Sequence, residues 1–230
     1  MKWVNKKINA VAIDGPAGSG KSTISRMVAV KLGYTYIDTG AMYRAATLKV
    51  MKKNISYQDE EKIIECVKDI DIKLAPSTEE GKTISVFLDS EDVTDEVRKM
   101  EVTVNVKHIC KIPKVRETLV ILQKKLAEKS NGTVMEGRDI GTVVLANAKY
   151  KFYLDADFDE RVKRRLQELK AKGQTITQEE VADDLYQRDY TDKTRKVGPL
   201  KQAEDAILID TTNLNIDQVV EKIVNYVKEG

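Results

Sequence analysis

Eight residues near the start of the chain have the types and spacing of a phosphate-binding loop. Residues 15–22 read GPAGSGKS and fit the pattern G-x-x-x-x-G-K-[ST] in full. The glycines let the backbone fold into a nest of N–H groups around phosphate oxygens. Lys21 can reach the terminal phosphates, and the Ser22 hydroxyl can hold Mg2+. We therefore predict a nucleoside triphosphate site made of Gly15, Pro16, Ala17, Gly18, Ser19, Gly20, Lys21, Ser22 and Thr23.

The elements around this loop are those that its mechanism needs. Residues 8–13 form an apolar, strand-like run, and apolar residues at helical spacing follow the loop as far as Leu32. Gly33 stands where a helix C-cap would. The helix N-terminus would add partial positive charge to the phosphate site. A strand, the loop and a helix in this order favour a nucleotide site over a glycine-rich turn without function.

Other charged residues follow predicted strands. The strand at 34–37 leads to Asp38 and Thr39, which are good N-cap residues for a helix that carries Arg44 in its first turns. Ligands sit at the carboxyl ends of open parallel sheets, so Arg44 could hold a second phosphate group, or it could be a solvated helix arginine. A buried strand at 133–135 ends in Glu136, Gly137, Arg138 and Asp139, which is typical of an active-site edge.

Two carboxylates compete for a place near Mg2+. Glu136 follows one predicted strand, and Asp155 follows another at 151–154. The sequence leaves this choice open.

Composition and rare residues exclude several functions. Lys plus Arg number 39 and Asp plus Glu 37, so the net charge of +2 implies no general attraction to nucleic acid. We see no membrane-spanning run and no signal peptide, and expect a cytoplasmic protein without a membrane partner. His108 is the only histidine, and Cys66 and Cys110 are the only cysteines. These residues argue against a Ser-His-Asp or Cys-His hydrolase and against a zinc site.

The middle of the chain departs from an alternation of strands and helices. Residues 60–68 predict a helix, and alternating apolar residues at 70–74 and 84–88 predict an antiparallel hairpin with Gly81 in its turn. We interpret this part as an inserted subdomain. Pro113 can begin the next helix, in which Arg116 lies beside a stripe that we expect to be buried, formed by Val115, Leu119, Leu122 and Leu126.

Two later helices carry many charges. Capping patterns predict helices from residues 157 and 177, and a continued second helix would place Arg188, Asp192 and Arg195 on one face. Such a face could belong to a mobile basic lid that excludes water, or simply be solvated. A strand at 206–210 and an amphipathic helix end the chain.

The chain resembles the bacterial cytidylate kinase family over nearly its whole length. The matching stretches are residues 12–22, 36–44 (YIDTGAMYR), 115–117 (VRE), 137–145 (GRDIGTVVL) and 188–195. The second and fourth stretches together are highly specific. The resemblance implies an α/β P-loop NTPase three-layer fold, with a five-stranded parallel sheet core, a small antiparallel β-containing NMP-binding insertion and a short helical lid. As one kinase domain, 1–230, it would comprise a core at about 1–59, 110–156 and 191–230, the insertion at about 60–109 and the lid at about 157–190.

The resemblance also implies the reaction and the residues that perform it. ATP and CMP or dCMP would give ADP and CDP or dCDP, with Mg2+, in a monomer that binds only small molecules. By matching position, Arg116 and Asp139 would read cytosine. The sugar would be held by Thr39, Arg188 and Asp192, and the phosphates by Arg44, Arg138 and Arg195. Tyr43 completes the substrate-binding set, and the catalytic residues would be Lys21, Arg138, Arg188 and Arg195.

Three positions depart from the family. Many members have Ser where this chain has Lys107, and a lysine cannot copy a hydroxyl that both donates and accepts. The family often has Asp in place of Glu136 and Pro in place of Ala146. The Lys107 difference bears on base selectivity more than on reaction type.

Two other classes of protein remain as alternatives. One is another P-loop small-molecule kinase, acting on AMP, on both UMP and CMP, or on shikimate. The other is a nucleotide-dependent switch protein, which normally carries an Asn-Lys-x-Asp guanine motif. Residues 5–8 (NKKI) begin this motif but lack its Asp and precede the phosphate-binding loop.

Overall fold

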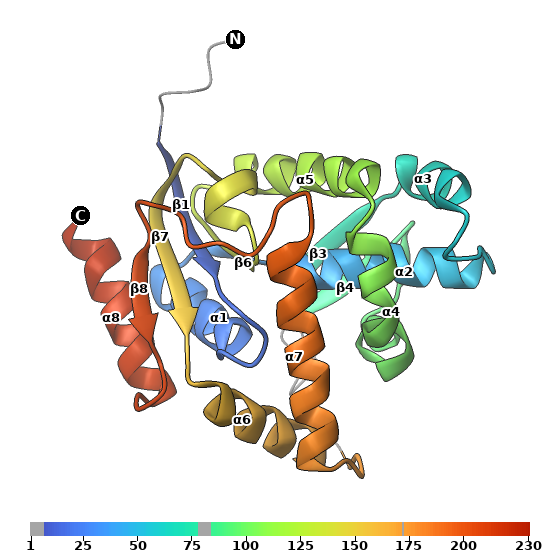
Figure 1. The fold of residues 1–230 in the computed structure, drawn as a ribbon. Helices are drawn as coiled ribbons and strands as arrows, with labels where there is room; N and C mark the ends of the chain where they lie inside the picture. The colour runs from blue at the N-terminus through green and yellow to red at the C-terminus, as the bar shows by residue number, and fades with distance from the viewer. Residues whose placement is uncertain (1–6, 78–83, 172) are drawn as a thin grey trace. The chain divides into compact units, whose positions relative to one another are not determined.

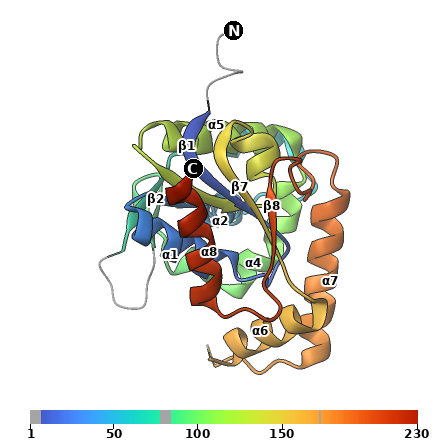
Figure 2. The same cartoon turned by 90° about the vertical axis from the view of Figure 1, so that its left-hand side faces the viewer.

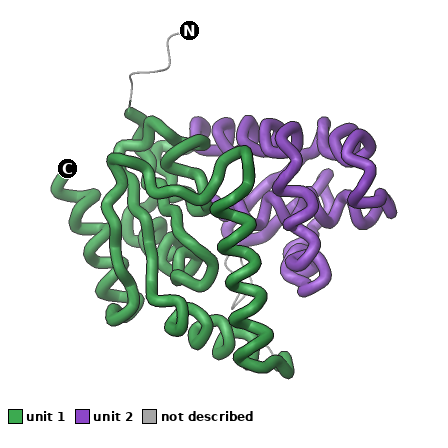
Figure 3. Tube along the Cα trace, viewed as in Figure 1, with its two compact units in different colours: residues 1–36, 130–230 green, residues 37–129 purple. Residues whose placement is uncertain are grey.

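The structure is a computed structural model that describes residues 7–77, 84–171 and 173–230. The chain divides into two compact units (Figure 3). Unit 1 comprises residues 1–36 and 130–230, and unit 2 comprises residues 37–129. The predicted bounds of the core, the insertion and the lid stay predictions.

A five-stranded sheet forms the centre of unit 1, and it confirms the predicted parallel core (Figure 1). The strand order β2-β6-β1-β7-β8 places β1 in the middle, because the chain crosses over between non-adjacent strands. Asp14 at the end of β1 is level with Gly137 of β6 and Tyr153 of β7, so these strands end at one edge of the sheet. The strands are β1 (Ile8–Asp14), β2 (Thr35–Asp38), β6 (Thr133–Gly137), β7 (Ala148–Asp155) and β8 (Ile207–Asp210).

Two helices cover one face of this sheet, α1 (Lys21–Leu32) and α8 (Ile216–Glu229) (Figure 2). Their apolar side chains and those of the central strands form one buried cluster, which includes Val28, Phe152 and Ile223. Gly33 ends α1 in the left-handed conformation, with φ of 67°, as predicted. This packing fixes α1 directly behind the phosphate-binding loop.

A helical pair completes unit 1, formed by α6 (Phe158–Ala171) and α7 (Gln178–Thr194). A small apolar cluster joins the two helices and includes Leu185 and Ala17 of the loop. Thr177 and Glu180 form the predicted capping box at the start of α7. Because α7 ends at Thr194, Arg195 lies just beyond the helix, as its C-cap residue.

Unit 2 contains the predicted hairpin. Strands β3 and β4 pair antiparallel, and β4 also pairs with a short β5 that the sequence did not indicate. The predicted turn at Gly81 lies outside the described residues. The strands are β3 (Ile72–Pro76), β4 (Ile84–Leu88) and β5 (Glu91–Asp92). The helices are α2 (Thr39–Lys52), α3 (Glu60–Lys68), α4 (Met100–Cys110) and α5 (Pro113–Glu128), with a 3-10 turn at Glu96–Arg98.

Most helix caps and buried positions in unit 2 agree with the predictions from the sequence. The Asp38 side chain caps α2 by accepting from Ala41 N at 2.9 Å, and Pro113 lies in the first turn of α5. The predicted stripe of α5 is correct only in its first half. Leu122 and Leu126 are partly exposed, and the buried positions continue instead through Gln123 and Ala127.

Candidate active site

The phosphate-binding loop joins the end of β1 to the start of α1. Gly15 has φ of 151°, and a Cβ atom there would lie 2.0 Å from the Leu154 carbonyl oxygen, so only glycine fits. Gly20 is left-handed, with φ of 84°, and serves as the N-cap of α1 without a side chain that could occupy the helix N-terminus. The backbone N–H groups at this end of the helix can therefore donate hydrogen bonds to an anion.

Lys21 lies buried beneath the loop. Its ammonium donates to the Pro16 carbonyl oxygen at 2.5 Å and to Ser19 Oγ at 3.2 Å. Burial, followed by the nearby charge of Arg138, lowers the Lys21 pKa to about 7, although carboxylates of unit 1 oppose this shift. The site therefore lacks a full countercharge for this lysine, and a polyphosphate would supply one.

Ser22 and Glu136 meet beside the loop. Ser22 Oγ donates to Glu136 Oε2 at 3.0 Å, and the Tyr36 hydroxyl donates to the other carboxylate oxygen. The rival carboxylate, Asp155, accepts from the neighbouring backbone N–H of Ala156 at 2.9 Å. A hydroxyl and a carboxylate are hard oxygen ligands of the kind that Mg2+ prefers.

No complete metal cage accompanies this pair. Within the described ranges, no group of three or more His, Cys, Asp or Glu side chains could hold a metal ion. An ion bound through Ser22 and Glu136 would therefore need oxygens from water or from a bound phosphate.

Asp192 of α7 gathers two of the predicted phosphate-binding arginines. It accepts from Arg138 Nε at 2.7 Å and from Arg195 Nη1 at 3.1 Å. Arg195 also approaches Asp139 Oδ1 at 3.6 Å and donates to the Gly198 carbonyl oxygen at 2.6 Å. Burial lowers the Arg138 pKa, but the charges of acidic neighbours, Asp192 first, outweigh it, so that this pKa is raised. Four of the predicted residues thus form one network in unit 1.

Arg188 stands apart from this network. It pairs with Asp184 one turn earlier on α7, with Nε and Nη2 each 3.0 Å from a carboxylate oxygen. Its side chain is 28% exposed, against 7% for Arg195. The two arginines predicted to share a helix face therefore have different surroundings.

A buried ion pair holds the outer side of the loop. Arg161 of α6 and Asp189 of α7 lie 2.6 Å apart. Arg161 also donates to the Ala17 carbonyl oxygen at 3.0 Å, and Asp189 accepts from Ala17 N at 3.3 Å. Both polar groups of one loop residue are thus satisfied by α6 and α7, the helices in which the family resemblance implies a lid. We predicted no role for Asp189, although its place beside Arg188 in a matching stretch was a signal.

Unit 2 holds the remaining predicted substrate residues. Thr39 is buried in the first turn of α2. Arg44 lies further along the same helix, and its Nη2 pairs with Oδ2 of the N-cap residue Asp38 at 3.2 Å. The Arg116 guanidinium of α5 lies 5.3 Å from the centre of the Tyr43 ring, and it donates to the Cys110 carbonyl oxygen at 3.4 Å. The fold thus brings Tyr43 and Arg116 together across α2 and α5.

The other positions that differ from the family, the histidine and the cysteines have ordinary environments. Lys107 is exposed on α4, and the Ala146 carbonyl oxygen accepts from Lys151 Nζ at 2.6 Å. His108 stacks on Tyr57 with ring centres 4.7 Å apart. Both cysteines are free thiols.

Two features that could matter to the site were missed from the sequence. Asp14 is buried at the end of β1, and each of its carboxylate oxygens accepts a backbone N–H, from Ile140 and Gly141. A charged residue that ends an otherwise apolar strand was the available signal. The contact between Tyr36 and Glu136 had no local signal, because it joins segments 100 residues apart.

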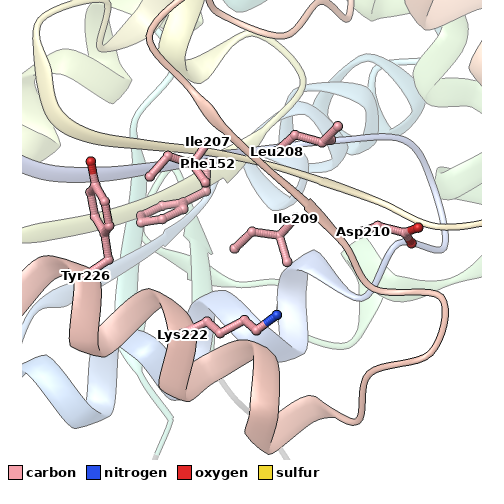
Figure 4. Close-up of a pocket in the computed structure, with 7 residues that line it drawn as sticks. All are labelled: Phe152, Ile207, Leu208, Ile209, Asp210, Lys222 and Tyr226. Atoms are coloured by element: carbon pink, nitrogen blue, oxygen red, sulfur yellow. The ribbon is translucent and has the colours of Figure 1, made fainter.

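A cavity of about 440 Å³ lies elsewhere, between β8 and α8 (Figure 4). Of the residues that line it, none belongs to the predicted site: Phe152, Ile207, Leu208, Ile209, Asp210, Lys222 and Tyr226. The chemistry described above does not involve this cavity.

In the described part of the chain, no helix has the length and apolar character needed to cross a membrane.

Comparison with known proteins extends over almost the whole chain. The family model for Cytidylate kinase matches residues 11–229. A cytidylate kinase of Caldanaerobacter subterraneus subsp. tengcongensis is 51% identical over 220 residues, which cover 96% of this chain and 95% of that protein. A cytidylate kinase of Caldicellulosiruptor bescii is 52% identical over 221 residues, which cover 95% of each.

Solved structures show the same fold at much lower identity. An uncharacterized protein from Eubacterium ventriosum has a TM-score of 0.52 at 12% identity, and the match covers 98% of this chain and 100% of that one. This likeness concerns the fold alone.

Proposed function

The chain belongs to the cytidylate kinase family, and we propose how its residues divide the work of this enzyme. It is a nucleoside monophosphate kinase, which transfers the γ-phosphoryl group of ATP to CMP or dCMP and releases ADP and CDP or dCDP. Such a transfer needs positioning and charge stabilisation more than a strong base, because the acceptor phosphate oxygen is already anionic.

The ATP phosphates are held by the loop of residues 15–23. Lys21 gains its missing countercharge from them and stabilises the charge that develops during transfer. Ser22 and Glu136 hold Mg2+, and the contact of 3.0 Å between their oxygens supports this assignment over Asp155. When bound, the ion would neutralise phosphate charge and orient the γ-phosphoryl group.

The arginines neutralise phosphate charge, so that the two anionic substrates, ATP and CMP, can approach each other despite their repulsion. We assign Arg138 and Arg195 to the transferring phosphoryl group and Arg44 to the monophosphate. Arg suits this work because its planar fork binds phosphate bidentately and is always charged. The observation that carries the assignment is the shared carboxylate of Asp192, which holds Arg138 and Arg195 in unit 1, the unit that also contains the loop.

The acceptor is recognised by its base and its sugar. Asp139 accepts from the N4 amino group of cytosine, and Arg116 donates to N3 and O2. The burial of Arg116 and Asp139, at 2% and 4% exposure, supports this role, because a buried polar mismatch discriminates strongly. The sugar is held by Thr39, Arg188 and Asp192, and Tyr43 keeps Arg116 in place through its ring.

The enzyme acts as a monomer on small molecules in the cytoplasm, where its nucleotide substrates are found. The balance of 39 basic and 37 acidic residues supports the absence of a nucleic acid partner.

A coupled assay of ADP release, run with each nucleoside monophosphate in turn, tests this function. We expect rapid release with CMP and dCMP and little with AMP, UMP or shikimate. Faster release with AMP or shikimate would indicate a different small-molecule kinase. Slow hydrolysis that is indifferent to CMP would indicate a nucleotide-dependent switch.

A further inference from the structure

Asp14 links the start of the phosphate-binding loop to a distant turn. Its side chain lies at the end of β1 with 4% exposure. Oδ1 accepts from Ile140 N and Oδ2 accepts from Gly141 N, each at 2.8 Å. One carboxylate thus holds two consecutive backbone N–H groups more than 120 residues away in sequence.

These two N–H groups directly follow Asp139. Residues Ile140–Val144 form a single wide turn, in which the Asp139 carbonyl oxygen accepts from Val143 N and Val144 N at 2.9 and 3.1 Å. The turn therefore begins at Asp139, and Asp14 fixes the backbone one and two residues later. Any shift of Ile140 and Gly141 would carry the Asp139 carboxylate with it.

The same turn is confined from a second direction. A Cβ atom on Gly141 would lie 3.3 Å from Lys151 Cδ, 3.4 Å from Asp14 Oδ2 and 3.5 Å from Ala203 Cβ. Lys151 itself is held by Asp205 at 2.8 Å. A methyl group at position 141 would therefore be tight against the Lys151 side chain and in ordinary contact with Asp14 and Ala203.

Burial makes the Asp14 charge costly. It raises the Asp14 pKa to about 6, although the bonds from Gly141 and Ile140 lower this pKa. The carboxylate is still ionised at neutral pH and can accept both N–H groups at once. Asparagine has the same shape but only one acceptor oxygen, so it cannot accept both N–H groups. The charged carboxylate is therefore needed to hold both residues.

We propose that Asp14 is a positioning residue for base selection, which holds the backbone so that the Asp139 carboxylate meets the cytosine amino group. This inference rests on the proposed role of Asp139 and adds a residue that does not itself touch the substrate. Asp14 sets the angle of Asp139, and Arg195 restrains the same carboxylate from the side of α7.

The substitution Asp14→Asn tests the proposal, because an amide has one acceptor oxygen and its NH2 group would oppose the second N–H. We expect KM for CMP to rise about tenfold, with KM for ATP changed less than about threefold. The Asp14 charge also raises the Lys21 pKa, so any fall in kcat should be the same with CMP and UMP. The preference for CMP over UMP in kcat/KM should fall at least about tenfold. A loss of stability alone would lower activity on both nucleotides equally.

Two further variants make the test decisive. Gly141→Ala adds a methyl group against Asp14 Oδ2 and Lys151 Cδ without changing Asp14, so it should lower the preference in the same direction, by less than Asp14→Asn does, even if Asp14→Asn does not fold. Asp205→Asn removes only the charge of the exposed partner of Lys151, whose ammonium also donates to the Ala146 carbonyl oxygen, so the preference should stay unchanged. A wild-type preference that survives both Asp14→Asn and Gly141→Ala would overturn the role of Asp14 only. A wild-type enzyme without any preference would overturn the role of Asp139 as well.

Discussion

Ser22 and Glu136 are 114 residues apart in sequence, yet the hydroxyl of one donates to the carboxylate of the other at 3.0 Å. The contact joins the first turn of α1 to the end of β6, and the strand order places β6 beside the central strand β1. It turns a choice that the sequence left open, between Glu136 and Asp155, into an assignment that can be tested.

Glu136→Gln should weaken Mg2+ binding while it preserves the shape of the site. The amide keeps an acceptor for Ser22 but loses the negative charge, so the Mg2+ concentration for half-maximal activity should rise at least about tenfold. Titration of Mg2+ at saturating ATP and CMP measures this value. Asp155→Asn is the matched comparison, and a larger shift in that variant would show that Asp155 holds the ion instead.

Lys21 should take up a proton when ATP binds. Burial lowers its pKa to about 7, so much of the ligand-free enzyme has a neutral Lys21 at pH 8, and the phosphates restore the charge. Calorimetric titrations of Mg-ATP in buffers of different ionisation enthalpy measure the uptake. It should be large at pH 8 and small at pH 6. The same uptake in Lys21→Met would assign it to another group.

The lowered Lys21 pKa also has a consequence for stability. The Lys21 pKa is about 7 in the folded protein and 10.5 in an ordinary lysine. Between these two pH values the unfolded chain binds a proton that the folded protein does not, so the free energy of unfolding falls as the pH drops from 10.5 toward 7. Ligand-free Lys21→Met should therefore melt a few degrees higher than the unaltered protein at pH 6, and this gain should shrink toward pH 10. Its kcat should fall by orders of magnitude. Unchanged melting at pH 6 with near-normal kcat would contradict the role assigned to Lys21.

Arg188 and Arg195 should respond differently to alanine. From the sequence we would expect both variants to lose turnover at an unchanged melting temperature. Arg195 is buried against Asp139 and Asp192, so Arg195→Ala should also cost about 3 kcal/mol of stability.

Arg188 pairs with Asp184 on its own helix and is more exposed, so Arg188→Ala should lower kcat with little change in melting temperature. Thermal unfolding and steady-state kinetics on both variants check this contrast. A normal kcat in Arg188→Ala would show that Arg188 serves only as the ion-pair partner of Asp184.

Local patterns predicted the elements well, because their causes lie within a few residues. Asp38 caps α2, Gly33 ends α1 and Thr177 starts α7 by contacts of short sequence separation. The family motifs identified the charged residues of the site. In α5 the spacing of leucines misled us, because buried polar Gln123 took the place that Leu122 was expected to fill.

Pairings between distant segments could not be predicted in this way. The clamp of Arg161 and Asp189 on Ala17, and the bonds of Asp14 to residues 140 and 141, depend on strand crossovers and helix packing. The sequence shows which charges exist, and the fold decides which of them neutralise each other. That is why Arg188 and Arg195 look equivalent in the sequence and differ in the structure.

The ratio of kcat/KM for CMP to kcat/KM for UMP tests the central claim most directly. Uracil O4 would oppose the Asp139 carboxylate, and its N3–H would oppose Arg116, so the unaltered enzyme should prefer CMP by roughly 10⁴-fold. In Asp139→Asn the amide can turn its NH2 toward O4, and the ratio should narrow through a larger loss with CMP than with UMP. Lys107 complicates this comparison, because it could donate to O2 of either pyrimidine. Unaltered enzyme that phosphorylates CMP and UMP within tenfold of each other would contradict the assignment of Arg116 and Asp139 as the selective pair.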